Sequence, residues 1–385
     1  MLEKVVKGSP LYWAWLAFLA ALSAVGVAIF IWQMVTGTEY TALSRDVAWG
    51  FYIANYTFMV GVAASAVMVV IPYYLHNQKE FGKIIALGEF LAVGAILTVV
   101  LFITVDIGQP GRMFNLLLHP TPNSPFFWNA TILPGYALLN LVIAWFTLDA
   151  LARGMPMPRW VWWLILLSIP WAISIHTMTS FVYSGLVARP FWNSAVLTPR
   201  FLSSAFASGP ALLILLGLAV RRFTKFDPGM GALGKLSLIV TYAMVINLFL
   251  ILTEVFVVLY GAVPGHTEHL QYLYFGLNGH GVLVPWMWAS AILGVAGVAL
   301  LINPDVRRNP MWLGIACAAV YLSTWIDKGL GLVVGGFVPT PLEHITEYFP
   351  TIGEFVMAAA IYALALLVIT LLYKIAIATR EELAA

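Results

Sequence analysis

Long runs of apolar residues, separated by short polar connections, dominate the sequence. A helix needs about 20 predominantly apolar residues to cross the hydrocarbon core of a bilayer, and ten runs reach that length. Because a backbone in lipid must satisfy its hydrogen bonds internally, each run is expected to form a helix. The predicted spans are residues 11–36, 48–75, 83–105, 127–150, 160–187, 201–220, 236–261, 281–302, 311–334 and 353–378.

We therefore predict an all-α polytopic membrane protein in which residues 1–385 form a single integral membrane domain. A short internal match hints at duplication, because His176 in the fifth span precedes Gly185 by nine positions and Asp327 in the ninth span precedes Gly336 by nine positions. The match suits two four-helix bundles with one helix outside each. The expected parts are a peripheral first helix (11–36), a first bundle (48–187), a second bundle (201–334) and a last helix (353–378).

The basic residues predict the orientation. Of the 19 Lys and Arg residues, 14 fall on the side that holds both termini, and cytoplasmic connections carry the excess of such residues. Both termini are therefore predicted to be cytoplasmic. The first apolar run follows Lys4 and Lys7, but it is longer than the core of a signal peptide and has no clear cleavage site, so we expect it to be retained.

Composition excludes several classes of protein. Hydrophobic residues make up 62% of the chain and charged residues 9%, against about 25% charged in soluble proteins, so no substantial part is expected to fold in water. No basic run suits a phosphate backbone, and nucleic acid is not an expected partner. Cys317 is the single cysteine, which excludes an iron-sulfur cluster held by this chain alone. Only His176 lies well inside a span, so a haem with two histidine ligands is not expected, and the loose spacing of His266, Glu268 and His269 predicts no metal site.

Charged residues inside the spans are the functional candidates. A charge at the middle of a membrane helix costs about 2.5–3.5 kcal/mol, so those that persist usually face a cavity or a partner. The residues of this kind are Glu89, Asp106, His176, Glu254, Asp327, Lys328 and Glu354.

One group of polar residues suits a lipid-borne quinone. His176 lies in the outer half of the fifth span and Tyr183 two turns further along the same face, and Asn55 reaches a similar depth in the second span. Aromatic residues could flank the ring, and a histidine can exchange protons near neutral pH while Asp106 relays them outward. The alternative is that His176 only bonds a neighbouring helix. The other aromatic candidates on the second span are Trp49, Tyr52 and Tyr56.

A second group of charges lies in the later spans. Glu254, Asp327, Lys328, His280 and Glu354 are predicted to cluster near the outer face. Two interpretations remain open: an ion-pair network that locks the second bundle, or a proton half-channel for which Glu89 forms the cytoplasmic entrance.

The connection after the third span carries a recognisable motif. The sequence Thr-Val-Asp106-Ile-Gly-Gln-Pro110-Gly-Arg112 resembles the Asp-x-Gly-x-Pro-x-Arg signature of the NrfD/PsrC superfamily of quinone-interacting membrane subunits, and its ten spans resemble the DsrP-like branch. The second span, which opens at Trp49, and the sixth, which opens with Arg200-Phe-Leu-Ser-Ser, are also similar to the family's patterns. The resemblance covers nearly the whole chain.

This resemblance implies a haem-free subunit in the cytoplasmic membrane of a prokaryote that binds menaquinone near the outer face. It implies an extracytoplasmic iron-sulfur partner, often with a multihaem cytochrome c and further membrane or cytoplasmic subunits. Electron exchange with such a partner would make the chain part of an oxidoreductase complex. Asp106 and Arg112 carry over from the signature itself, whereas His176, Tyr183 and Asn55 are placed near the quinone by helix equivalence. Relatives thought to move protons would give Glu89, Glu254 and Asp327 a role.

Two other functions fit the same pattern of helices. A secondary transporter is also built from duplicated helical units with buried charges between them, and the glycines at 329, 331, 335 and 336 are compatible with one. A purely structural membrane anchor for partner enzymes would have the same fold and would bind no quinone.

Overall fold

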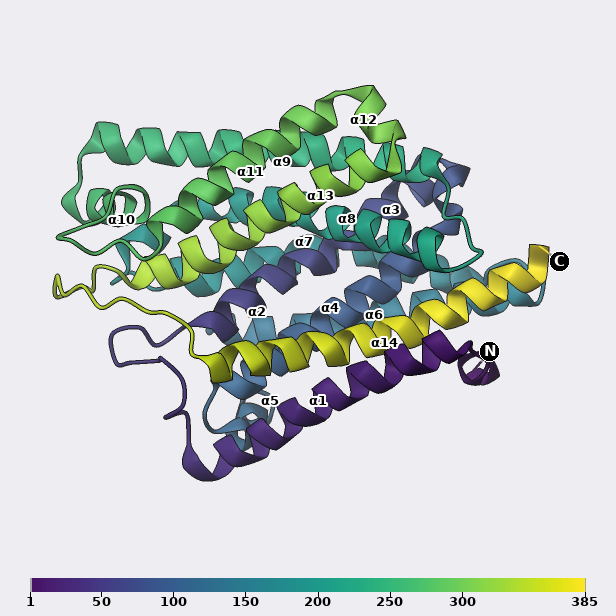
Figure 1. The fold of residues 1–385 in the computed structure, drawn as a ribbon, viewed down its shortest axis with the longest axis horizontal. Helices are drawn as coiled ribbons and strands as arrows, with labels where there is room; N and C mark the ends of the chain where they lie inside the picture. Colours follow the sequence, from purple (N-terminus) through teal and green to yellow (C-terminus); the bar gives the residue numbers. More distant parts are fainter. Residues whose placement is uncertain (1, 385) are drawn as a thin grey trace.

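The ten predicted spans are present in the computed structural model, which describes residues 2–384. Within that range, ten helices are long and apolar enough to cross a membrane, and they run side by side through the molecule (Figure 1). They are α1 (Pro10–Thr36), α2 to η3 (Phe51–Leu75), α4 (Ile85–Asp106), α6 (Pro125–Ala152), α7 (Arg159–Ser184), α8 (Leu197–Phe223), α9 (Met230–Gly261), α11 (Val284–Ile302), α13 to η8 (Pro310–Phe337) and α14 (Ile352–Ala384).

Two of the spans change helix type along their length. The second is built from α2 (Phe51–Val62), η2 (Ala63–Ser65), α3 (Val67–Val70) and the π-helix η3 (Ile71–Leu75). The ninth is built from α13 (Pro310–Trp325), the π-helix η7 (Ile326–Val334) and η8 (Gly335–Phe337). The short helices outside the spans are η1 (Leu2–Val6), η4 (Lys79–Lys83), η5 (Pro110–Phe114), α5 (Asn115–Leu118), η6 (Pro190–Trp192), α10 (Pro264–Tyr274) and α12 (Pro304–Arg308).

The spanning helices pack as two rings. In the first unit α2 contacts α4, α4 contacts α6, α6 contacts α7 and α7 contacts α2; in the second unit α8 contacts α9, α9 contacts α11, α11 contacts α13 and α13 contacts α8. Helices α1 and α14 pack against each other, and α14 lies against α4. The two units meet where α2 packs against α8 and η7, and one hydrophobic core runs through both.

Both termini lie at the same end of the bundle, which we call the terminal end (Figure 1). Lys4 Nζ lies 2.8 Å from a carboxylate oxygen of Glu382 at that end. The longer connections lie at the opposite end, called here the loop end. The shared side of the termini agrees with the even number of spans, and its assignment to the cytoplasm stays a prediction.

Several helix boundaries differ from the sequence prediction, and the largest shift at a helix start is in α9. Helix α9 begins at Met230, six residues before the predicted start. The prediction followed the apolar run, whereas the helix extends beyond it to include Lys235, which lies at the surface and pairs with Glu80 at 3.1 Å. The predicted connection at 264–280 contains a helix, α10, which begins with a proline at its first position, where the fixed φ of proline suits helix initiation.

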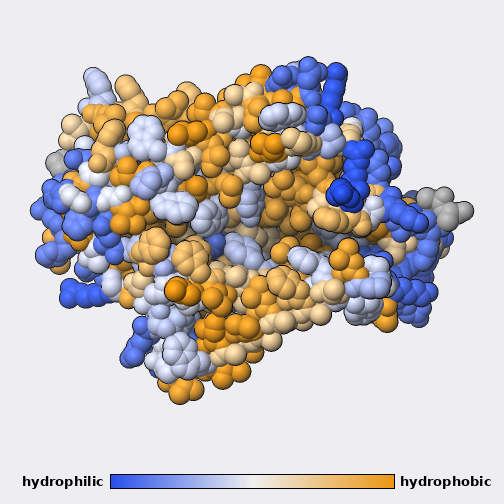
Figure 2. Space-filling model, viewed as in Figure 1, coloured by the Kyte–Doolittle hydropathy of each residue, from blue (hydrophilic) through white to orange (hydrophobic). Residues whose placement is uncertain are grey.

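The surface matches a protein surrounded by lipid. Between the two ends the visible face is largely apolar, whereas hydrophilic residues gather at both ends (Figure 2). On the outermost helix of the second unit, α9, Leu252 and Phe249 are about two-thirds exposed, which a soluble surface would seldom tolerate in such a continuous patch. The chain is a multi-pass membrane protein.

Candidate functional site

An aromatic cluster lies at the loop end, between the two units. It consists of Trp49 before α2, Tyr183 near the end of α7, Trp192 in η6 and Phe337 in η8. The ring of Trp49 stacks on Trp192 with 5.6 Å between centroids and meets Tyr183 edge-on at 5.5 Å. Trp192 donates its indole N–H to the carbonyl of Leu332 at 2.8 Å, which fixes this cluster to η7. Segments from both units therefore hold the predicted quinone-binding residues Trp49 and Tyr183.

Hydrogen bonds connect this cluster to the interior of the first unit. Tyr183 shares a hydrogen bond with Thr57 of α2. Asn129 of α6 donates to the hydroxyl of Tyr56 at 2.7 Å and accepts from Thr179 of α7 at 3.1 Å. Neither Asn129 nor Thr179 could be identified from the sequence, because single polar residues in apolar helices carry no spacing signal.

His176 is fully buried on α7. Both of its ring nitrogens lack a hydrogen-bond partner within residues 2–384, and its ring meets Phe206 edge-on at 6.4 Å. The interpretation of His176 as a hydrogen bond between helices is therefore wrong. Buried polar groups without a partner are rare, which makes His176 a candidate for chemistry.

Asn55 and Tyr52 make structural contacts. Asn55 Oδ1 accepts from Trp325 Nε1 at 3.0 Å and from Tyr362 OH at 2.8 Å, so it joins α2 to α13 and α14. The hydroxyl of Tyr52 lies 2.9 Å from that of Tyr40, which lies in the connection after α1. Their contact with a quinone stays a prediction.

The signature motif forms the exit of α4. The helix ends at Asp106, the chain turns at Gly108 with a φ of +66°, and η5 begins at Pro110. One carboxylate oxygen of Asp106 is buried without a partner, whereas Arg112 is exposed. Within the described residues no ion pair joins the two side chains. The motif therefore points Asp106 into the protein and leaves Arg112 on the loop-end surface.

Glu89 lies apart from these residues, near the start of α4 at the terminal end. Its side chain is fully buried, and neither carboxylate oxygen has a hydrogen-bond partner among residues 2–384. The hydroxyl of Tyr136 on the neighbouring helix α6 is likewise buried and unpartnered. This position agrees with the predicted depth of Glu89.

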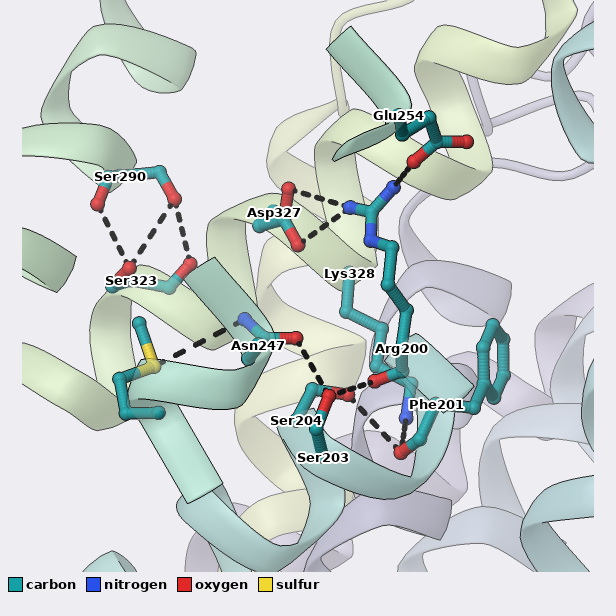
Figure 3. Close-up of polar contacts among 11 residues, drawn as sticks. Arg200, Phe201, Ser203, Ser204, Asn247, Glu254, Ser290, Ser323, Asp327 and Lys328 are labelled. Atoms are coloured by element: carbon teal, nitrogen blue, oxygen red, sulfur yellow. Dashed lines mark hydrogen bonds and ion pairs between the residues drawn. The ribbon is translucent and has the colours of Figure 1, made fainter. Parts of the chain in front are cut away.

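An ionic cluster lies inside the second unit (Figure 3). Arg200 Nη2 on α8 donates to both carboxylate oxygens of Asp327 at 3.0 and 2.9 Å, and Arg200 Nη1 donates to Glu254 of α9. All three side chains are about nine-tenths buried. Glu254 and Asp327 therefore belong to one cluster, as predicted, and Arg200 joins them by donating to both. The sequence predicts Arg200 just before the sixth span, whereas α8 begins at Leu197 rather than at 201 and so includes it.

Lys328 belongs to the boundary between the two units. Its Nζ lies 4.2 Å from the centre of the Phe201 ring and 3.4 Å from the Phe201 carbonyl oxygen. A Cβ at Gly61 of α2 would lie 3.3 Å from this Nζ, so the glycine makes room for the ammonium group. The π-helix η7 brings adjacent Asp327 and Lys328 both into the protein interior, and such widened turns are frequent at functional sites.

His280 and Glu354 do not join the ionic cluster, contrary to the prediction. His280 Nδ1 lies 3.1 Å from Glu347, which also accepts from the backbone N–H of Val282 at 2.8 Å. Burial raises the pKa of Glu347, but these two contacts outweigh it and hold the pKa below its usual value. Glu354 accepts from Tyr348 at 2.5 Å and from the N–H of Ala42 at 3.0 Å. Both carboxylates instead order the loop end.

His266, Glu268 and His269 all lie in α10, and His269 makes its contacts within the protein. His269 is buried against Phe191, with 5.4 Å between ring centroids, and its Nδ1 lies 3.3 Å from the Gly335 carbonyl oxygen. Burial lowers the pKa of His269 to about 4, so the imidazole is neutral at physiological pH. Its role in the structure is to pack α10 onto η8.

Two cavities adjoin the ionic cluster. The larger, with a volume of about 410 Å³ including its open mouth, lies between α8, α9, α10, α11 and η7 and is lined by Arg200, Glu254 and Asp327 together with apolar residues. The smaller, of about 210 Å³, is lined by Lys328, Ser204 and Asn247 and shares Arg200 and Asp327 with the first. The ionic cluster therefore separates an apolar cavity from a more polar one.

Curated proteins similar to this chain belong to reductases and a menaquinol oxidoreductase. It is 26% identical to a putative dimethyl sulfoxide reductase membrane subunit of Halobacterium salinarum, over 84% of this chain and 77% of that protein. It is 23% identical to the "Hdr-like menaquinol oxidoreductase integral membrane subunit" of Archaeoglobus fulgidus, over 95% and 93% of the two chains. It is also 23% identical to a selenate reductase subunit of Mesobacillus selenatarsenatis, over 94% and 92%.

The family profile described as "Polysulphide reductase, NrfD" matches residues 39–337, which include the Asp106 motif, the aromatic cluster and the ionic cluster. This match covers more than half of the chain and confirms the family that the motif indicated. The protein belongs to the NrfD family.

Proposed function

We propose that this chain is the quinone-reacting membrane subunit of a prokaryotic respiratory oxidoreductase complex in the cytoplasmic membrane. It binds a lipid quinone of the menaquinone class in the first unit, near the loop end, and exchanges electrons with an extracytoplasmic iron-sulfur protein. The observation that carries this proposal is His176, a fully buried histidine with two unpartnered nitrogens, on the same helix face as Tyr183 of the aromatic cluster. The DsrP-like branch and a menaquinol-linked relative support the choice of quinone.

The first unit offers the parts that quinone chemistry requires. Trp49 and Tyr183 supply aromatic faces for the ring, and Tyr52 and Asn55 complete the polar wall on α2. Oxidation of a quinol releases two electrons and two protons. His176 accepts the two protons one at a time from the quinol hydroxyls, and Asp106, at the exit of α4, passes each of them toward the loop end. The electrons leave to the partner's iron-sulfur centre, and the reverse direction uses the same groups.

The loop end provides a surface for the partner. Arg112 is exposed beside Phe114, Leu117 and Leu118, which are each more than half exposed on short helices that do not cross the membrane. Apolar side chains gathered around a basic residue are typical of a protein interface. The iron-sulfur protein is proposed to dock here, with a multihaem cytochrome c and further membrane or cytoplasmic subunits completing the complex.

Proton movement is proposed to accompany this chemistry. Glu89 provides an ionisable group at the terminal end, and Glu254 and Asp327 provide two near the loop end of the second unit. Lys328 lies at the boundary between the units, which supports a route that passes from one unit to the other.

The test is purification of the tagged chain from native membranes in mild detergent. Mass spectrometry of the copurifying polypeptides and quantification of extracted quinone are the two measurements. We expect an iron-sulfur protein at near-equal amount and bound quinone. A well-folded chain without partner or quinone would contradict the proposal, and solute uptake into vesicles would then test the transporter. Partner without quinone would indicate a structural anchor.

A further inference from the structure

Lys328 has fewer partners than a buried ammonium group needs. It is 4% exposed and forms no ion pair within residues 2–384. Asp327 is its neighbour in sequence, but both oxygens of that carboxylate accept from Arg200. The ammonium group has three N–H donors, and the acceptor it reaches among the described residues is the carbonyl oxygen of Phe201 at 3.4 Å. Buried charges are normally paired and hydrogen-bonded, so Lys328 needs a further acceptor.

The smaller cavity lies beside this ammonium group. Lys328 lines it together with Ser204, Asn247 and Asp327. Its enclosed part has room for about one water molecule, which is too little for an organic ligand. The space therefore admits water or a small ion.

The other polar groups around this cavity offer acceptors. Ser204 Oγ donates to the Phe201 carbonyl at 3.1 Å, which leaves the lone pairs of the hydroxyl free. Asn247 Oδ1 accepts from Ser203 at 3.3 Å, and in Figure 3 this oxygen points toward α8. An amide oxygen can accept a second hydrogen bond. The cavity thus has ammonium N–H donors on one side and oxygen acceptors on the others.

A water molecule fits this arrangement better than an ion. Water accepts from an ammonium group and donates to oxygen atoms, and internal waters typically make about three such bonds. A metal cation would meet the ammonium of Lys328, and a chloride ion would lie against the carboxylate of Asp327. Lys328, Arg200, Asp327 and Glu254 together carry no formal net charge, so no excess charge is left for an ion to balance.

We infer that the smaller cavity binds an internal water molecule, which joins Lys328 at the boundary between the units to Asp327 in the ionic cluster. The inference rests on the proposed function, because it assigns one step of the proposed proton movement to this water. The Lys328 ammonium gives a proton to the water, and the water gives one of its own to an Asp327 carboxylate oxygen. The lysine becomes a neutral amine and the aspartate a neutral acid, and the reverse transfer restores both. Ser204 and Asn247 position the water.

The test is radiolytic footprinting of the purified complex in nanodiscs, prepared in water enriched in the heavy oxygen isotope. Ionising X-rays convert bound water to hydroxyl radicals, which attach the heavy oxygen to the nearest reactive side chain. Phe201 lines the cavity and is buried from bulk solvent, so we expect mass spectrometry to find the label there. Phe58 is also fully buried but lines neither of the two cavities, and it should stay unlabelled.

Ser204→Val overfills the cavity and removes a hydroxyl acceptor, so the label at Phe201 should fall about tenfold. In proteoliposomes this variant should also lose the protons released beyond those of the quinol itself. Ser237→Val is the matched control and should change neither quantity. Ser237 is likewise a buried serine that donates to a backbone carbonyl of its own helix, that of Gly234, and it lines neither cavity. Ser204→Thr, which adds one methyl group, serves if the valine variant does not assemble.

The outcomes separate this inference from the proposed function. Absence of label at Phe201, or label that Ser204→Val leaves unchanged, overturns the water site. Label that falls in Ser204→Val while proton release stays native overturns the transfer through Lys328, as does a native complex that releases the protons of the quinol alone. A complex that oxidises no quinol contradicts the proposed function, and the label at Phe201 then still decides the water site.

Discussion

Arg200 Nη2 donates to both carboxylate oxygens of Asp327, at 3.0 and 2.9 Å, across 127 residues of sequence. The contact joins the first turns of α8 to the π-helix η7, and Arg200 extends it to Glu254 on α9. Three helices of the second unit are therefore held by one guanidinium group. Because these side chains are about nine-tenths buried, protein rather than bulk water surrounds most of each charged group.

Replacing Arg200 by methionine should destabilise the second unit strongly. The substitution leaves Glu254 and Asp327 buried without a counter-charge, and loss of one partner of a buried ion pair costs about 3–5 kcal/mol. The thermal unfolding midpoint of the complex in nanodiscs measures the effect. The triple variant Arg200→Met, Glu254→Gln, Asp327→Asn should recover most of the loss, because the uncompensated charges are removed with the arginine.

Arg221→Met is the matched control for that substitution. Arg221 pairs with Asp227 at 3.5 Å on the surface of the terminal end, where such pairs contribute about 0–1 kcal/mol. Equal destabilisation by Arg200→Met and Arg221→Met would show that the buried ion pairs contribute no more to stability than a surface pair does.

Gly336→Ala should disturb the aromatic cluster. A Cβ at this position would lie 2.2 Å from Trp192 Nε1, so the indole would have to move and lose its hydrogen bond to Leu332. Overpacking of this kind costs about 1–3 kcal/mol, measurable as a lower unfolding midpoint and a shift in tryptophan fluorescence. Gly261→Ala, which adds a methyl group with no neighbour within 4 Å, should change neither quantity.

The loop end should lose one stabilising contribution in acid. The pKa of Glu347 is below its usual value in the folded chain, so its ionised form stabilises the fold above the ordinary carboxyl pKa of about 4.3. That contribution is lost as the pH falls through the lowered pKa. The difference in unfolding midpoint between the native chain and Glu347→Gln should therefore be present at pH 7 and shrink below pH about 4. A difference that stays constant down to pH 3 would contradict this account.

Asp106→Asn should separate function from stability. One oxygen of Asp106 has no hydrogen-bond partner, so an amide of the same shape should leave the unfolding midpoint nearly unchanged. Loss of a proton relay typically lowers a rate by about 100-fold or more, and steady-state quinol oxidation by the complex measures it. Asp149→Asn, at a surface ion pair with Arg153, is the control and should retain the native rate. Equal rates for all three proteins would exclude Asp106 from proton transfer.

The spans could be predicted from the sequence because lipid imposes a length and an internal hydrogen-bond requirement on every apolar run. The family was indicated by a different signal, the motif that begins at Asp106. Its glycine and proline are the residues that turn the chain where α4 ends. Helix α10 was missed because its composition is mixed and it does not cross the membrane. The grouping of Glu254 with Asp327 was foreseen from depth alone, but Arg200 was not, because the start of α8 was placed four residues too late.

The side-chain environment could not be predicted from the sequence. Depth along a helix does not give the rotation of that helix, so the sequence could not show that the amide of Asn55 bonds Trp325 and Tyr362. His280 and Glu354 lie at the expected end of the molecule but bind partners in the loops. Which polar group meets which neighbour depends on packing between helices, and no periodicity in one helix reports it.

The most direct test of the central claim is quinol oxidation by the purified complex carrying His176→Phe. His176 makes no hydrogen bond within residues 2–384, so the variant should keep its unfolding midpoint and its partners while the maximal rate falls about 100-fold. His76→Phe, at an exposed terminal-end position away from the proposed docking surface, should keep the native rate. A folded His176→Phe complex that oxidises quinol at the native rate would contradict the assignment of the quinone chemistry to this histidine.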